Sequence, residues 1–263
     1  MTELNWAVEQ IRVGDADLIV DRAGQGPLVL LLHEELGCPG TTEWQVELAK
    51  NHTLIQVHHP GFSRTESVQW ISSMRDLACF YAWFLREQKL TPTAVIGFSL
   101  GGWIAAEMAA NDPSLFSKIT LVGAAGIQPP VGEILDLYMI TADEYLRRSV
   151  IDPTATAEFG SLYGIEQTPE QYEAFEEARA ETARLAWKPY MFNQSLPNLL
   201  EAVANVPTLI IWGEKDQIVP FSVGERYRAA IPGSELLTIS GAGHRPEIEQ
   251  KEEFLKAVKG FLG

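Results

Sequence analysis

Three side chains of the types that carry out acyl transfer each follow an apolar run of the sequence. Ser99 stands in the middle of the stretch GFSLG, after the run at 93–98 and before the helix-forming stretch at 100–111. The pattern G-x-S-x-G between a strand and a helix presents a nucleophile on a tight turn, where side chains at the glycine positions would collide with neighbouring backbone. A glycine turn can also serve packing alone, so Ser99 needs partners before it predicts chemistry.

Asp216 and His244 are those candidate partners. Asp216 follows the run TLIIWG and a turn, and His244 follows the run LLTIS and the loop GAG. Each has an ordinary alternative. Asp216 could be a solvated or helix-capping aspartate, and Glu214 in the same turn is a competing carboxylate. His244 could be a polar loop residue. The order Ser, Asp, His at three separate strand ends instead predicts a catalytic triad. Ser99 would attack, His244 would accept its proton and Asp216 would orient the ring. As His244 becomes protonated, kcat/KM should fall on the acidic side with an apparent pKa near neutral.

The elements that must position these residues alternate between strands and helices. Strand-like runs lie at 6–13, 16–23, 27–33, 53–61, 93–98, 117–126, 206–213 and 234–240, and helical patterns at 41–50, 72–88, 100–111, 221–230 and 249–262. This alternation predicts an α/β fold with a largely parallel sheet and helices on both faces. Ligands bind at the carboxyl ends of such strands, where the three residues are expected. From about 128 to 205 helical, acidic segments replace the strand-like runs, which predicts a helical insertion.

The chain resembles the α/β-hydrolase fold superfamily over nearly its whole length. The resemblance rests on GFSLGGWIAAEMA, VPTLIIWGEKDQIVP, IPGSELLTISGAGH and HHPGFSRTE, and ARLAWKPYMFNQ resembles the cap of capped bacterial hydrolases. It implies a mostly parallel eight-stranded sheet flanked by helices, with a core at 1–127 and 206–263 and a helical cap at 128–205. The family's triad roles are carried over to Ser99, Asp216 and His244.

An oxyanion hole needs two backbone N–H donors. Leu100, directly after the nucleophile, would supply one, and the loop LLHEELGCPG after the third strand would supply the other. Relatives carry His-Gly-x in that loop, which implies Glu35 as the second donor and leaves Glu34 where glycine is usual. The two carboxylates either deter anionic substrates at the pocket or face solvent. His33 is expected to brace the loop.

Several substrate classes fit this arrangement. A serine nucleophile argues against epoxide hydrolases and haloalkane dehalogenases, which use aspartate. Carbon–carbon bond hydrolases of ring-cleavage products usually have Asn before the serine and Trp after the histidine, where this chain has Phe98 and Arg245. Prolyl iminopeptidase-like enzymes hold an amine with cap glutamates, for which Glu158, Glu166 and Glu170 are candidates. A ligand receptor of the same fold with little turnover is a further alternative.

The best class is a small or medium apolar carboxylic ester, cleaved through an acyl-enzyme (a carboxylesterase-like activity). The side chains that could line its pocket are Glu34, Phe98, Trp103, Tyr138, Met139, Trp187, Met191 and Arg245. Each aromatic or methionine among them could equally be ordinary packing.

The bulk properties limit the partners. A formal net charge of −15 argues against nucleic acid and against an anionic membrane surface. No residue at ligand spacing completes a metal site with His52, His58 and His59, and adjacent histidines in a strand should face opposite sides of the sheet. Cys38 and Cys79 show neither metal-ligand spacing nor a disulfide framework. We expect no metal and no cofactor. The sequence carries no signal-peptide pattern and no membrane-length apolar run, so we expect a cytoplasmic monomer or homodimer acting on a small-molecule substrate.

Overall fold

An eight-stranded sheet forms the centre of the protein in the computed structural model, which describes residues 4–164 and 167–263. The strand order is β1-β2-β4-β3-β5-β6-β7-β8; β2 pairs antiparallel with β1 and β4, and all other pairs are parallel. The strands are β1 (Ala7–Val13), β2 (Ala16–Gly24), β3 (Leu28–Leu32), β4 (Thr53–Val57), β5 (Thr93–Phe98), β6 (Phe116–Val122), β7 (Thr208–Gly213) and β8 (Glu235–Ile239). The predicted fold class is confirmed.

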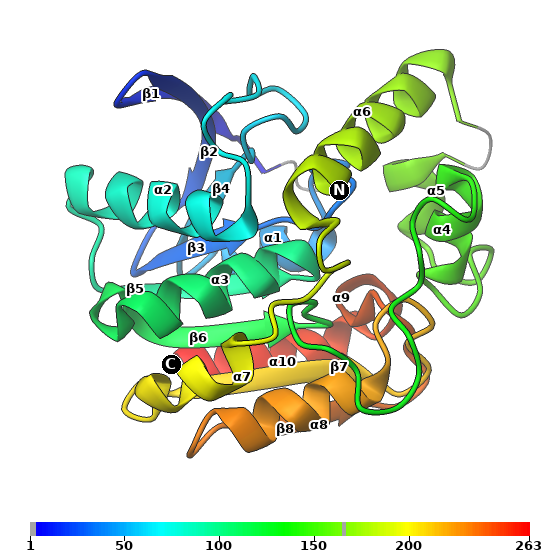
Figure 1. Ribbon diagram of the computed structural model, residues 1–263. Helices are drawn as coiled ribbons and strands as arrows, with labels where there is room; N and C mark the ends of the chain where they lie inside the picture. Colours follow the sequence, from blue (N-terminus) through cyan, green and yellow to red (C-terminus); the bar gives the residue numbers. More distant parts are fainter. Residues whose placement is uncertain (1–3, 165–166) are drawn as a thin grey trace.

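Helices cover both faces of the sheet (Figure 1). One face packs against α2 (Met74–Glu87), α3 (Leu100–Asn111) and α8 (Phe221–Ala230), and the other packs against α1 (Glu43–Leu48) and α10 (Lys251–Leu262). Alternate residues of β3 point to the two faces of the sheet. Leu30 and Leu32 pack in the core on the side of α2, α3 and α8, and Val29 and Leu31 pack in the core on the side of α1 and α10. Burial on both faces explains why this strand is an uninterrupted apolar run.

Between β6 and β7 the chain forms only helices and loops among its described residues. They are α4 (Ala142–Arg148), α5 (Phe159–Tyr163), α6 (Pro169–Ala186), α7 (Leu196–Leu199) and the 3₁₀ turn η2 (Leu200–Val203). Local signals start the two longest of them: the Thr141 hydroxyl accepts from the Glu144 amide, and Thr168 forms a capping box with Gln171. In Figure 1, α4, α5 and α6 lie together to one side, while α7 lies against α3 and α8. The boundaries 128 and 205 stay a prediction.

The sheet brings three strand ends together at its carboxyl edge. Ser99 follows β5, Asp216 follows β7, and His244 follows β8 and precedes the short helix α9 (Pro246–Glu249). The loops after β7 and β8 approach so closely that a side chain on Gly213 would collide with the Gly243 carbonyl. The glycine there is therefore required for the close contact between these two loops.

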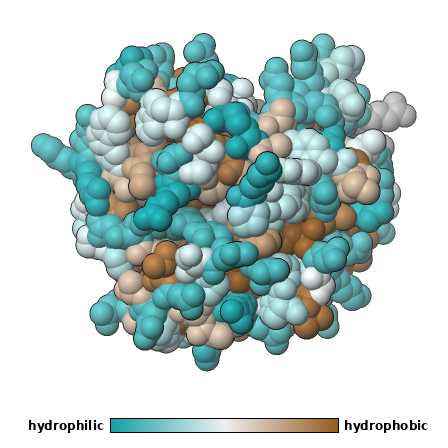
Figure 2. Space-filling model, in the orientation of Figure 1, coloured by the Kyte–Doolittle hydropathy of each residue, from teal (hydrophilic) through white to brown (hydrophobic). Residues whose placement is uncertain are grey.

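The surface in the view of Figure 2 is mostly hydrophilic, with hydrophobic side chains in small groups between polar ones. No helix in the described ranges has the length and apolar character to cross a lipid bilayer.

Candidate active site

Ser99 sits on a strained turn between β5 and α3. Its φ of 46° and ψ of −109° lie in a region that residues other than glycine rarely adopt. The turn is held from both sides, because the Ser99 amide donates to the Val122 carbonyl at 2.9 Å and its carbonyl accepts from the Ala125 amide at 3.2 Å. A Cβ on Gly97 would lie 2.5 Å from the Gly101 carbonyl oxygen. The glycines of GFSLG thus permit the turn that places Ser99 at the end of β5.

Asp216 and His244 form a buried pair. His244 Nδ1 lies 2.8 Å from Asp216 Oδ2, and both side chains are almost completely buried. The other oxygen, Oδ1, accepts from the amides of Ile218 at 2.8 Å and Val219 at 2.9 Å. These three hydrogen bonds fix the carboxylate, and the carboxylate in turn fixes the ring with Nε2 as its remaining nitrogen.

Gly123 brings the histidine next to the serine turn. It follows Val122, to which Ser99 is bonded, and a Cβ at its φ of +51° would lie 3.0 Å from His244 Nδ1. Ser99 Oγ and His244 Nε2 are both buried, and in residues 4–164 and 167–263 neither has a hydrogen-bond partner. Two buried, unpaired polar atoms on segments that both contact the pair Val122 and Gly123 can join in a catalytic hydrogen bond, which often tightens only when substrate binds.

The environment raises the basicity of His244. Burial by itself lowers the pKa of the imidazole, but the charge and hydrogen bond of Asp216, helped by the charge of Glu35, raise the pKa from 6.5 to about 9. The imidazolium that would form when Ser99 loses its proton is therefore stabilised by two carboxylates.

Two amides are available for an oxyanion. Leu100 is the first residue of α3, and Glu35 lies in the loop after β3. Within the part of the chain that the structure describes, neither amide donates a hydrogen bond. The Glu35 carbonyl instead accepts from Thr182 Oγ1 at 3.0 Å, which ties this loop to α6. Both residues lie where the sequence pattern predicts the donors, and their role stays a prediction.

His33 braces this loop, as predicted. Its Nε2 accepts from the His59 amide at 3.0 Å, so Nδ1 carries the proton that it donates to the Glu34 carbonyl at 2.6 Å. Burial keeps the pKa of His33 well below 6.5, so the ring stays neutral. The adjacent histidines diverge as expected, because His59 contacts His33 while His58 Nε2 lies 2.9 Å from Asp21 Oδ2.

Glu34 forms an ion pair with Arg245 and does not face solvent. Its carboxylate lies 2.6 Å from Arg245 Nη1, and both side chains are less than a tenth exposed. Arg245 also donates from Nε to Ser149 Oγ at 2.6 Å and from Nη1 to the Tyr163 hydroxyl, whose ring lies 4.5 Å from its Cζ. The alternative of solvent-facing glutamates is wrong for both residues, since Glu35 is completely buried.

The remaining pocket candidates fall into two groups. Trp103 and Met191 are buried, and Phe98 is partly buried beside a cavity of about 60 Å³ that Glu34, Arg245 and Glu247 also line. Tyr138, Met139 and Trp187 are 38, 78 and 43% exposed. Tyr138 and Trp187 instead stack edge to face, with ring centroids 5.2 Å apart, so these three are not placed in a buried acyl pocket.

Glu158 and Glu170, the two described candidates for an amine site, have other surroundings. Glu158 Oε2 accepts from the Glu43 amide at 2.7 Å and so serves the start of α1. Glu170 lies fully exposed in the first turn of α6, and Glu166 lies outside the described residues. The iminopeptidase reading therefore has no support from Glu158 or Glu170.

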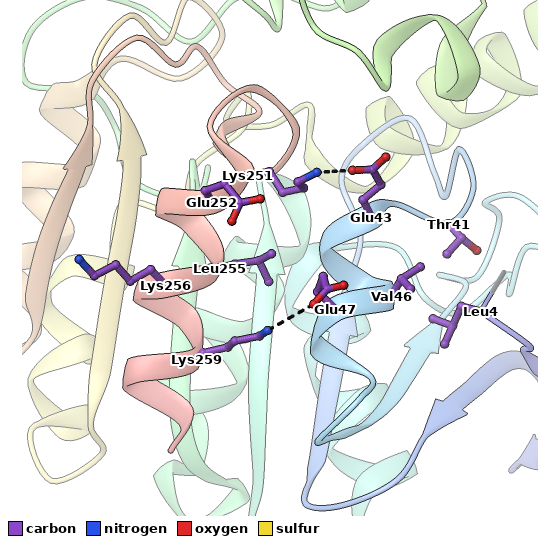
Figure 3. Close-up of a pocket in the computed structure, with 10 residues that line it drawn as sticks. All are labelled: Leu4, Thr41, Glu43, Val46, Glu47, Lys251, Glu252, Leu255, Lys256 and Lys259. Atoms are coloured by element: carbon purple, nitrogen blue, oxygen red, sulfur yellow. Dashed lines mark hydrogen bonds and ion pairs between the residues drawn. The ribbon is translucent and has the colours of Figure 1, made fainter. Parts of the chain in front are cut away.

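A wide groove of about 1,020 Å³ lies elsewhere, between α1 and α10 (Figure 3). Ion pairs from Lys251 to Glu43 and from Lys259 to Glu47 cross it. None of the three triad candidates lines the groove. No group of three or more metal-ligating side chains is found among the described residues either.

The structure adds neighbours that the sequence patterns do not identify: Gly123, Tyr145, Ser149, Tyr163 and Thr182. Four of them come from α4, α5, α6 or their ends. The glycines of the stretch VGAAG after β6 are the only local signal for any of them.

Comparisons with known proteins agree with this fold. A family model described as "Alpha/beta hydrolase family" matches residues 13–257. A 2-hydroxy-6-oxononadienedioate/2-hydroxy-6-oxononatrienedioate hydrolase of Paraburkholderia xenovorans is 27% identical over 270 residues, which cover 95% of this chain and 91% of that protein. Among solved structures, a meta-cleavage product hydrolase of Pseudomonas fluorescens has a TM-score of 0.78 at 23% identity, covering 97% of each chain. A thermophilic esterase of Thermogutta terrifontis has a TM-score of 0.76 at 22% identity, covering 98% of each chain.

Proposed function

Because the chain belongs to the alpha/beta hydrolase family, we propose that it is a serine hydrolase that cleaves small or medium apolar carboxylic esters. One observation carries the proposal: Ser99 occupies a strained strand-to-helix turn, next to a buried His244 whose Nδ1 lies 2.8 Å from Asp216. A nucleophile, a base and a group that orients the base are the three parts that acyl transfer requires.

The reaction follows from the roles of these groups. Ser99 Oγ attacks the ester carbonyl while His244 Nε2 takes its proton, and the amides of Leu100 and Glu35 stabilise the oxyanion. The protonated His244 then gives its proton to the departing alcohol, which leaves an acyl group on Ser99. Water, activated by the same histidine, releases the acid and restores the serine. The helical segment at 128–205 would cover this centre as a cap.

The relatives make carbon–carbon bond cleavage the second candidate, since the Paraburkholderia relative is named for a dienedioate substrate. A dioate carries two negative charges and needs cations to bind it. Arg245 is already paired with Glu34, and the buried Glu35 adds a negative charge nearby. These charges favour a neutral ester over a dianion.

Turnover of defined substrates tests the proposal. Purified protein is assayed against p-nitrophenyl acetate, butyrate and octanoate and against a ring-cleavage dienoate, with Ser99→Ala as the control. Ester hydrolysis that disappears in Ser99→Ala supports the proposal. Dienoate turnover above ester turnover favours carbon–carbon cleavage, and tight binding of a small ligand without any turnover favours a receptor. Ester hydrolysis that Ser99→Ala leaves unchanged contradicts the mechanism.

A further inference from the structure

Glu35 combines complete burial with an unpaired carboxylate oxygen. Its side chain is 0% exposed, and Oε1 accepts a hydrogen bond from the Tyr145 hydroxyl of α4. Oε2 is buried too, and no donor among the described residues reaches it. Buried polar atoms are nearly always paired in folded proteins, so this unpaired carboxylate oxygen is open to a partner such as a water molecule or a group of the substrate.

No cationic side chain of the described residues forms an ion pair with this carboxylate. In residues 4–164 and 167–263, no Lys, Arg or His nitrogen lies within 4.0 Å of a Glu35 carboxylate oxygen. The nearby guanidinium of Arg245 is held 2.6 Å from the neighbouring Glu34 carboxylate and bonds to Ser149 as well. The ion pair therefore belongs to Glu34, and within the described ranges Glu35 has no ion-pair partner of its own. A buried carboxylate without an ion pair is costly, and a cation that binds beside it lowers that cost.

The carboxylate lies close to the proposed reaction centre. Its amide is the proposed second oxyanion donor, and its charge is one of the causes that raise the pKa of His244. The residue is fixed in place, because Thr182 donates to its carbonyl and Tyr145 donates to its side chain. A fixed negative charge beside an oxyanion hole opposes the oxyanion that forms from a neutral ester. A positive charge carried by the substrate would offset both charges at once.

We propose that Glu35 makes this site selective for esters that carry an ammonium group in the acyl or the alcohol part, a substrate class that rests on the proposed ester hydrolysis. The ammonium group would take the position beside the unpaired Oε2, with the Tyr145 hydroxyl holding the other oxygen. Water cleaves the ester to the acid and the alcohol, and the ammonium group itself is unchanged. The selectivity is therefore a matter of binding and of transition-state charge, without any further reactant.

Pairs of substrates that differ only in charge test this inference. On the alcohol side, butyrylcholine is compared with 3,3-dimethylbutyl butyrate, which replaces the ammonium nitrogen with carbon. On the acyl side, the p-nitrophenyl ester of 4-(trimethylammonio)butyrate is compared with that of 5,5-dimethylhexanoate. We expect kcat/KM for the cationic member of at least one pair to exceed that of its neutral isostere about tenfold or more, which is an attraction of ~1.4 kcal/mol.

Three variants assign the effect to the carboxylate. Glu35→Gln should bring the ratio within each pair close to one, because it removes the charge and keeps the shape. Tyr145→Phe should keep the preference, since the carboxylate remains. Glu144→Gln removes an exposed carboxylate of α4 that pairs with Arg148, and it should leave the ratio unchanged. Changes in the basicity of His244 affect both members of a pair alike, so the ratio isolates the charge of the substrate.

A ratio near one in the wild-type protein, or a preference that Glu35→Gln leaves intact, overturns the inference. Because Glu35→Gln can fail to fold, inhibition of wild-type ester hydrolysis by choline is measured beside inhibition by 3,3-dimethylbutanol, its neutral isostere. Stronger inhibition by the cation is expected, and equal or weaker inhibition overturns the inference. Neutral esters hydrolysed through Ser99 without any cation preference would leave the proposed function standing, whereas loss of all Ser99-dependent turnover would remove both.

Discussion

The guanidinium of Arg245 lies 2.6 Å from the carboxylate of Glu34, and both side chains are buried. Arg245 directly follows His244, and Glu34 directly precedes Glu35, so this ion pair joins the loop that carries the proposed base to the loop that carries a proposed oxyanion donor. The same ion pair therefore contributes to the stability of the protein and to the relative position of these two loops.

Replacing one member of this pair should destabilise the protein strongly. Arg245→Met keeps the volume of the side chain but leaves Glu34 buried without its cation. We expect the free energy of unfolding to fall by roughly 3–5 kcal/mol, the typical loss when one partner of a buried pair is removed. Urea denaturation followed by circular dichroism measures the change.

The double variant Glu34→Gln with Arg245→Met is the control for that measurement. It removes both charges, so it should recover most of the stability lost in the single variant. A single variant that loses less than about 1 kcal/mol, the range of exposed pairs, would contradict the buried character of the pair.

The pH dependence of hydrolysis should reflect the raised pKa of His244. The base must be neutral to accept the Ser99 proton, so kcat/KM falls as the pH drops below the pKa of the free enzyme. Asp216 and Glu35 raise that pKa to about 9, so the acidic limb should lie well above 6.5 and above the near-neutral position that the sequence pattern predicts. Glu35→Gln removes one of the two charges and should move the limb to lower pH. A limb at or below 6.5 in the wild-type protein would contradict the structure.

The strained turn at Ser99 should reduce stability in exchange for reactivity. Ser99→Gly permits the φ of 46° without strain, whereas Ser99→Ala retains a Cβ in the same turn. Both variants lose the nucleophile. The free energy of unfolding of Ser99→Gly should exceed that of Ser99→Ala by about 1 kcal/mol or more. Thermal and urea unfolding of the two variants provide the comparison, and equal stabilities would show that the turn carries no strain.

Gly123 should be needed for the position of His244. In Gly123→Ala the new Cβ would lie 3.0 Å from His244 Nδ1, on a backbone with positive φ. A displacement of the base by a few tenths of an ångström should reduce kcat by on the order of 10²-fold, with a smaller effect on KM. Steady-state kinetics on a p-nitrophenyl ester measures the loss.

Gly260 in α10 is the matched control position. An added Cβ there meets no atom of the described residues within 4 Å. Gly260→Ala should leave kcat unchanged and stabilise the helix by about 0.5–1 kcal/mol. If the two alanine variants had equal kcat values, Gly123 would have no role in placing the histidine.

The fold and the three triad candidates could be predicted because their signals are local. The apolar runs and their turns predict the strands, and each of Ser99, Asp216 and His244 follows a strand within a few residues. The parallel order of β5, β6, β7 and β8 then brings those ends to one edge of the sheet. The strain at Ser99 also follows from its two flanking glycines.

The surroundings of Glu34 and Glu35 could not be predicted, because they depend on contacts across the chain. Tyr145 lies 110 residues from Glu35, and Thr182 lies 147 residues away. Neither residue belongs to a motif, and the periodicity of α4 indicates only a buried face. Residue type alone could not place Tyr138 and Trp187, whose partly exposed rings contact each other edge to face.

One backbone hydrogen bond makes the position of the proposed base depend on α4. The His244 amide donates to the Ser149 carbonyl at 2.8 Å, and Ser149 is the residue that ends α4. The same serine holds Arg245 through its hydroxyl, so two consecutive residues of the histidine loop depend on its position. Movement of α4 away from the sheet would therefore pull the base out of line. A substitution that displaces α4 would thus slow hydrolysis through the base, although α4 carries none of the three triad candidates.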